Sequence, residues 1–144
     1  MSITQAMCDS FKVQILAGQQ NLTSGATPVY KIALYTSSAT LSNATTAYTT
    51  TNEQTSSSSN YTAGGNTLTV STSPTSTGNV AFMSFSNSSW TNANITANGA
   101  LIYKSTANTA VAVLAFGGDK TATNGTFSII FPTSDATNAI IRIA

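Results

Sequence analysis

Short segments in which apolar and polar residues alternate recur along this chain, and they constrain its fold more than any other feature. In residues 30–35, Tyr30, Ile32 and Leu34 occupy every second position, as expected for a half-buried strand. The other predicted strands are residues 67–71, 80–85, 100–103, 110–116, 127–131 and 139–143. Strands spaced by about 8 to 15 residues are typical of antiparallel sandwiches. The sequence therefore predicts an all-β fold, an antiparallel β-sandwich or jelly roll.

Glycine-containing pairs separate these predicted strands. Asn98-Gly99 and Asn124-Gly125 match the type I′ turn preference, so each predicts a tight hairpin turn. Gly64-Gly65 and Gly117-Gly118 predict tight turns as well. Neither of the latter pairs leads into a helix or is followed by Gly-Lys-Ser/Thr, which argues against a phosphate-binding loop.

Residues 2–17 predict the one helix of the chain. An apolar stripe of helical period is formed by Ile3, Met7, Phe11 and Ile15. Ser2 and Gln5 fit a capping box at the start, and Gly18 fits a C-terminal stop. The stripe has two interpretations: it packs onto the core of its own chain, or it docks onto another subunit.

Residues 47–63 form a polar stretch with four consecutive serines at residues 56–59, and could be a domain linker or a long loop. The 46 residues before it contain one predicted helix and one firm strand, which is too little to fold alone. The sequence therefore predicts a single domain, residues 1–144. It divides into an N-terminal helix and arm (1–21) and a β-sandwich (29–144) that contains the loop. Loops of this length tend to be functional or disordered.

Charge is scarce: 6% of residues are charged, and the net charge is +1. Soluble domains average about 25% charged residues. Serine and threonine together make up about a third of the chain. The five cations are scattered, so neither nucleic acid nor an anionic membrane is an expected partner. A weakly charged surface costs less to desolvate, which favours a component of an assembly.

Residues suited to catalysis are few. The chain has no histidine, which removes Ser-His-Asp and Cys-His sites and most zinc sites. Its four carboxylates are predicted to be turn caps and solvated groups, and the single cysteine, Cys8, a buried thiol that cannot form an intramolecular disulfide. We therefore expect no enzyme activity, no catalytic residue, no cofactor and no bound metal. We also expect no signal peptide and no membrane span.

Three aromatic residues suggest one binding alternative. Tyr48, Tyr61 and Trp90 could line a sugar platform, although large aromatic side chains more often supply core area. A sugar-binding sandwich would belong to a recognition module rather than to a structural component.

Several segments together resemble a group of small tailed-bacteriophage virion structural proteins. These segments are TQAMCDSFK, YKIALYTSSATLSNATTAYTTTNE, YTAGGNTL, ITANGALIY and AVLAFGGDKTATNGTFSIIFP with DATNAIIRIA. The resemblance covers nearly the whole chain and implies a capsid cement or decoration protein without catalytic residues. Residues 54–60 are more serine-rich than is usual in the group.

The resemblance implies a protein made in the host cytoplasm and located on the capsid surface of the virion. Its partners would be the major capsid protein or other virion proteins, and it would form a homo-oligomer, a dimer or trimer. We expect residues 2–21 and 47–62 to supply the contacts. The candidate partner-binding residues are Met7, Phe11, Ile15, Asn52, Glu53, Asn60 and Tyr61. The alternative is a tail- or neck-associated structural or adhesin module with a sugar- or host-binding sandwich.

Overall fold

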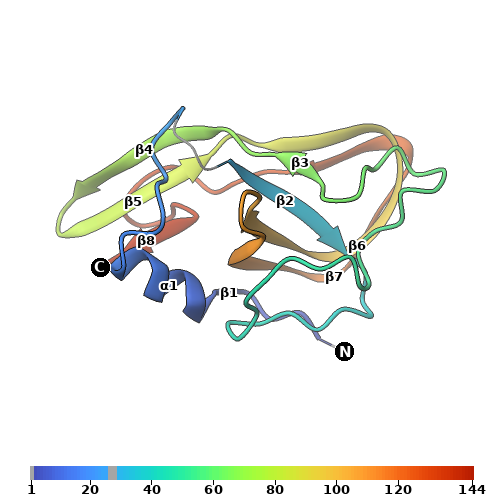
Figure 1. Cartoon of the computed structure of the whole chain (residues 1–144). Helices are drawn as coiled ribbons and strands as arrows, with labels where there is room; N and C mark the ends of the chain where they lie inside the picture. Colours follow the sequence, from blue (N-terminus) through green and yellow to red (C-terminus); the bar gives the residue numbers. More distant parts are fainter. Residues whose placement is uncertain (1, 26–28) are drawn as a thin grey trace.

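The computed structural model describes residues 2–25 and 29–144. Strands account for 49% of the chain and form two antiparallel sheets, with a single short helix in the described part (Figure 1). The prediction of an all-β, sandwich-like fold with an N-terminal helix is confirmed. Met1 of the predicted N-terminal segment, and residues 26–28 of the predicted turn before the first strand, lie outside the described residues.

The larger sheet has the strand order β1-β7-β6-β2-β3. Its strands are β1 (Ala6–Met7), β7 (Thr109–Ile129), β6 (Ser88–Lys104), β2 (Tyr30–Tyr35) and β3 (Asn66–Thr67). β6 and β7 form one long hairpin that extends along the molecule (Figure 1). The predicted strands 100–103 and 110–116 are the parts of this hairpin next to its turn, and residues 100–103 and 110–114 are buried on both faces.

The smaller sheet has the order β4-β5-β8, with β4 (Val70–Thr77), β5 (Val80–Phe85) and β8 (Ile141–Ile143). Gly78 and Asn79 connect β4 to β5, and both have positive φ, +58° and +70°. A two-residue turn of this kind matches the twist of the paired strands. The predicted strand 67–71 is divided, because the chain leaves the larger sheet after β3 and enters the smaller one at β4.

The predicted hairpin turns at Asn98-Gly99 and Asn124-Gly125 are wrong. Both pairs lie inside long strands, at positions where the pairing of β6 with β7 shifts register. Gly117-Gly118, predicted to be a turn between strands, also lies within β7. A β-bulge can use the same positive-φ residues as a tight turn, as it does at Gly117, Gly118 and Asn124, and sequence alone does not distinguish the two. The strands therefore continue through these pairs instead of reversing.

The predicted helix over residues 2–17 is also wrong in its first half. The helix, α1 (Asp9–Leu16), begins after β1, and its N-cap, Cys8, makes no side-chain hydrogen bond. The chain before α1 is extended: Thr4 N–H donates to the Leu41 carbonyl at 2.9 Å, and β1 pairs with β7. Backbone pairing with β7 and with the segment at Leu41 replaces the local helical bonds. The predicted stop is confirmed, since Gly18 follows the helix at φ +70°.

One hydrophobic cluster joins α1, both sheets and the segment after Tyr35. The largest side chains that are wholly inaccessible in it include Phe11, Ile32, Leu34, Tyr35 and Leu101. The described residues contain no helix that is long and apolar enough to cross a bilayer. Residues 47–63 cross one end of this core without regular strand structure, as predicted for a loop.

Candidate functional site

The seven predicted contact residues fall into three groups, buried, half-buried and exposed. Phe11 and Tyr61 are buried in the core of their own chain, with exposed fractions of 0% and 2%. Met7, Ile15 and Glu53 are half-buried. Asn52 and Asn60 are exposed, but both have positive φ and donate from their amides to backbone carbonyls, of Ser38 and Thr91. Among the predicted residues, Met7 and Ile15 are therefore the apolar side chains that reach the surface.

Glu53 is the centre of a polar cluster inside the long loop. Its Oε1 accepts hydrogen bonds from the Tyr61 hydroxyl and the Gly64 N–H, both at 2.7 Å. Its Oε2 accepts one from the Tyr48 hydroxyl, also at 2.7 Å. The Tyr61 hydroxyl in turn accepts the Leu34 N–H of β2 at 2.9 Å. The carboxylate thus fastens three points of the loop to each other and, through Tyr61, to the larger sheet.

The phenols around Glu53 stay protonated over the physiological range. Burial, followed by the hydrogen bond to Glu53, raises the pKa of both Tyr48 and Tyr61 above its usual range. Burial raises the pKa of Tyr103, whose ring stacks on Tyr48 at 4.5 Å, to about 12. A neutral phenol can donate a hydrogen bond. Tyr48 and Tyr61 donate to the Glu53 carboxylate, and Tyr103 donates to the Gly64 carbonyl. The cluster has one carboxylate, and its role in this geometry is to hold the loop.

The serine tract is ordered by contacts within the chain. Ser59 is 1% exposed, and its hydroxyl donates to the Thr55 carbonyl at 2.5 Å. Ser56 Oγ accepts the Ala63 N–H at 3.0 Å, and Gln54 Oε1 accepts the Thr96 N–H of β6 at 3.2 Å. The first three serines are exposed. Hydrogen bonds within the chain therefore connect the tract to the rest of the loop and to β6.

The predicted sugar platform of Tyr48, Tyr61 and Trp90 is not formed. Tyr61 and Trp90 pack against each other in the core, with ring centroids 5.8 Å apart, and Trp90 is 5% exposed. Tyr48 stacks on Tyr103 instead. These aromatics supply buried area, the alternative that the sequence left open.

The remaining carboxylates are surface groups. Asp135 accepts the backbone N–H groups of Thr137 and Asn138, at 2.8 and 2.7 Å, so it caps a turn as predicted. Hydrogen bonds from the Asn138 side chain and from those N–H groups lower the pKa of Asp135. Asp119 accepts from the Asn98 amide at 2.9 Å. Within the described ranges, no group of three metal-binding side chains comes together.

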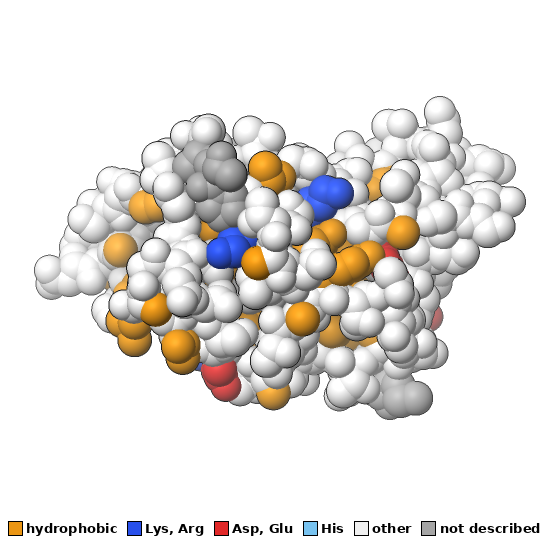
Figure 2. All heavy atoms as spheres, viewed as in Figure 1, with side chains coloured by type: hydrophobic (Ala, Val, Ile, Leu, Met, Phe, Trp, Pro, Cys, Tyr) orange, Lys and Arg blue, Asp and Glu red, His pale blue; other side chains and the backbone are white. Residues whose placement is uncertain are grey.

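Exposed apolar side chains gather where α1 meets β8. Leu16 is 90% exposed, Val13 65% and Ile143 48%. We call Leu16 and Ile143, with half-buried Met7 and Ile15, the α1–β8 surface; Val13 is exposed on the same helix but lines neither of the hollows described next. Figure 2 shows hydrophobic side chains over this end of the molecule. Leu16 and Val13 were not among the named contact residues, although both lie in the predicted contact segment 2–21, because the predicted stripe followed the residues that face the core, such as Phe11 and Ile15.

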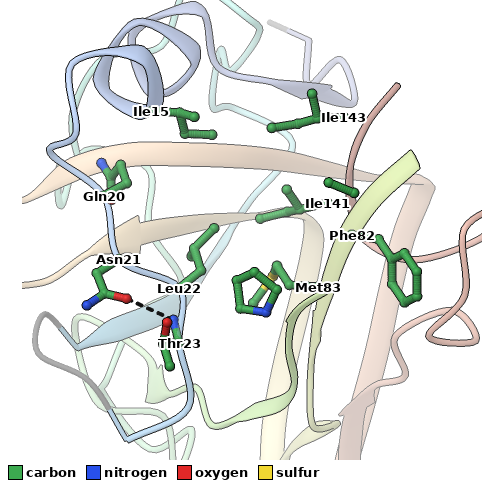
Figure 3. Close-up of a pocket in the computed structure, with 11 residues that line it drawn as sticks. Ile15, Gln20, Asn21, Leu22, Thr23, Phe82, Met83, Ile141 and Ile143 are labelled. Atoms are coloured by element: carbon green, nitrogen blue, oxygen red, sulfur yellow. Dashed lines mark hydrogen bonds between the residues drawn. The ribbon is translucent and has the colours of Figure 1, made fainter. Parts of the chain in front are cut away.

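Two hollows deepen the α1–β8 surface, and both include Ile15 and Ile143. One, of about 280 Å³, is lined by Met7, Lys12, Ile15, Leu16, Arg142 and Ile143. The other, of about 300 Å³, lies between the segment after α1 and strands β5 and β8 (Figure 3). In that hollow, Leu22, Met83 and Ile141 point inward from opposite sides (Figure 3). This arrangement offers a partner apolar recesses beside exposed apolar side chains.

The charged groups beside this surface are engaged. Lys12 pairs with Asp9 at 3.2 Å, and the Asn43 amide also donates to Asp9 at 2.8 Å. The hydrogen bond from Asn43 and then that from Lys12 lower the pKa of Asp9. Arg142 Nη1 donates to the Ala136 carbonyl at 2.9 Å. A partner covering the α1–β8 surface would therefore meet mainly apolar atoms.

Cys8 is expected to be unreactive in the folded protein. Its side chain is 0% exposed, which confirms the predicted buried thiol, and burial raises its pKa to about 11. Thiolate is the reactive form, so labelling by a disulfide reagent at pH 8 should be negligible in buffer and complete in denaturant. Fast labelling in buffer, in a protein shown by circular dichroism to be folded, would contradict this placement.

No protein-family model, curated protein or solved structure matches this chain.

Proposed function

We propose that this chain is a structural protein of a bacteriophage particle, a cement or decoration protein that binds and stabilises the capsid shell. The observation that carries the proposal is the α1–β8 surface, an exposed apolar face on a chain with few charges. Contiguous apolar patches on a protein surface mark interaction sites. The phage context comes from the sequence segments that resemble small virion proteins.

The proposed mechanism is mechanical. Covering Leu16 and Ile143 removes apolar area from water, which stabilises the contact by roughly 25 cal/mol per Å². Bridging two neighbouring capsid subunits by such contacts would strengthen the shell against internal pressure. Small energies for each copy add up when many copies attach, as in multivalent binding. Self-association as a dimer or trimer would present several such surfaces at once.

The polar loop, residues 47–63, is a less important contact in this proposal than the sequence indicated. Glu53 and Tyr61 hold the loop together, so its contact with a partner would be made by the exposed groups, such as Ser57, Ser58 and Asn60. The α1–β8 surface becomes the primary contact, and the loop a secondary one.

Replacing Leu16 with aspartate is expected to weaken attachment to capsids without unfolding the chain. Leu16 is 90% exposed, so the change should alter stability by less than about 1 kcal/mol. A charge placed in an apolar interface should reduce bound copies on purified shells by about tenfold or more. Quantitative mass spectrometry of sedimented shells measures this occupancy.

Ile130 provides the matched control for Leu16. It is also an exposed aliphatic residue, at 76%, but it lies outside the α1–β8 surface. Ile130→Asp should leave occupancy unchanged. Equal loss for both variants, or for neither, would remove the α1–β8 surface from the proposal.

Copy number in intact virions separates the capsid proposal from the tail or neck alternative. A shell protein is present in hundreds of copies, whereas a neck ring or baseplate part follows its closed symmetry, with about 6 to 12 copies. The capsid proposal expects hundreds of copies in each virion. A copy number of about 6 to 12 would instead favour the tail or neck alternative.

A further inference from the structure

A large β-bulge interrupts the pairing of β6 with β7. Ala115 pairs with Gly99 and Lys120 with Ala97, so residues 116–119 of β7 lie opposite the single residue Asn98. Gly117 and Gly118 have φ of +73° and +145°, and a side chain at either would meet open space. The Asn98 amide bonds across the bulge to Asp119. Bulges of this kind redirect side chains, and this one sets the position of Phe116.

Phe116 lines a hollow of about 430 Å³ on β7. We call it the β7 hollow; it is lined by Phe116, Lys120, Thr121, Thr126, Phe127, Ser128 and Ile129. A second hollow, of about 270 Å³, continues on the other side of Phe116 and Ser128 towards Gln5 and Ile130. The volume of the β7 hollow is within the usual range for small-ligand sites, about 300–1,000 Å³.

Phe116 is an exceptional aromatic in this chain. Of the twelve aromatic residues, all of them described, ten are buried, and the two partly exposed are Tyr48 and Phe116. Tyr48 is stacked on Tyr103 and bonded to Glu53. Phe116 packs only on the edge of the core, with its ring centroid 6.2 Å from that of Phe127. Phe116 lines both the β7 hollow and the second hollow, and it stays partly exposed there.

The lining combines an aromatic wall with three hydroxyls and one ammonium group. A saccharide has the complementary chemistry, since a sugar ring has an apolar C–H face and an edge of hydroxyls. Each Thr or Ser hydroxyl offers one donor and two acceptor positions, which suits sugar hydroxyls. We propose that the β7 hollow is a saccharide-binding site in which a sugar ring lies against Phe116 and its hydroxyls bond to Thr121, Thr126 and Ser128.

The site binds without cleaving. Hydrolysis of a glycosidic bond normally needs two carboxyl groups flanking it, and none lines the β7 hollow. Lys120 is the one charged side chain in the lining, so a sugar bearing a carboxylate, such as a uronic acid, should bind more tightly than its neutral counterpart. This inference is independent of capsid attachment, because the β7 hollow shares no residue with the α1–β8 surface.

A glycan array probed with the whole protein identifies the saccharide, and titration of the single tryptophan then measures affinity. Trp90 packs edge-on against Phe127, with centroids 6.2 Å apart, so it reports occupation of the hollow. Phe116→Ala should weaken binding by about tenfold or more, and Thr126→Val, which removes a hydroxyl at nearly constant shape, by several-fold. Lys120→Gln should remove the preference for uronic acids over neutral sugars.

Val29→Ala is the matched control, since Val29 is an exposed aliphatic residue that lines neither hollow; its affinity should stay within twofold of the parent. Thermal melting verifies that each variant is folded, and Thr126→Val decides the matter if Phe116→Ala does not fold. An array on which no glycan binds would overturn the proposal. Unchanged saccharide affinity in both Phe116→Ala and Thr126→Val would overturn it as well. Dimerisation that Phe116→Ala abolishes, with no glycan bound, would assign the hollow to self-association instead.

Discussion

Replacing Gly65 with alanine is expected to abolish stable folding. Gly65 has φ +75°, and a Cβ there would lie 1.7 Å from the Ile32 carbonyl oxygen and 2.8 Å from the Ala33 Cα. Both atoms belong to the backbone of β2, which is paired on its two sides with β6 and β3. Neither the strand nor the turn can yield without breaking that pairing. The expected loss is about 4 kcal/mol or more, comparable to the whole stability of a marginal domain.

Urea unfolding followed by circular dichroism measures this loss, with two matched controls. Gly25 has the same φ, +75°, but open space around its Cβ position, so Gly25→Ala isolates the backbone strain, about 1–2 kcal/mol. Gly125 has no positive φ, and its nearest contact would be at 3.6 Å, so Gly125→Ala should be nearly neutral. If Gly65→Ala is no worse than Gly25→Ala, the close approach to β2 is wrong.

Gly65 also illustrates what the sequence could establish about the fold. The Gly64-Gly65 pair predicted a turn, and that prediction is confirmed by the bond from the Gly65 N–H to the Thr62 carbonyl at 2.9 Å. The contact of Gly65 with Ile32 joins residues far apart in the chain, and no local pattern encodes it. The bounds of β2 and β5 were predictable because both strands are short, end at turns and bury apolar residues.

The errors share one physical cause. Asn98-Gly99 and Gly117-Gly118 favour positive φ or a close approach, and either a turn or a bulge satisfies that preference. Gly99 lies inside β6, where a Cβ would meet the Leu114 carbonyl oxygen at 2.6 Å and the Ile3 side chain at 2.7 Å. This close approach explains why the position is occupied by glycine. Residues 6–8 pair with β7, and residues 2–4 with the segment at Leu41, despite their helical period. In each case long-range pairing decided between two locally acceptable conformations.

The candidate surfaces followed from the structure more than from composition. The prediction that the N-terminal segment carries a contact remains untested, but its exposed apolar residues are Val13 and Leu16 rather than Phe11. Apolar periodicity identified Phe11 and Ile15, which face the core, whereas Val13 and Leu16 lie off that stripe and stay exposed. Phe116 had no sequence feature to distinguish it, because its exposure depends on the bulge that follows it.

Replacing Glu53 with alanine is expected to destabilise the chain by about 3–5 kcal/mol. The carboxylate accepts three hydrogen bonds, from Tyr48, Tyr61 and Gly64, each at 2.7 Å. Hydrogen bonds to charged groups contribute about 1.5–3 kcal/mol each, and their loss leaves the Tyr61 hydroxyl, in a side chain only 2% exposed, with one fewer partner. The free energy of unfolding from urea titration measures the total.

Two further variants test whether this loss comes from the cluster itself. Glu53→Gln keeps the shape and one acceptor oxygen, so it should cost about 1–2 kcal/mol, and Tyr48→Phe, which removes one bond but keeps the stack on Tyr103, about 1 kcal/mol. Amide exchange should be faster at Gly64 and Leu34 in Glu53→Ala, because both N–H groups depend on the cluster. If Glu53 served only as a partner contact, as its place in the polar loop first indicated, Glu53→Ala would keep parental stability and exchange rates and would lose only its binding to capsids.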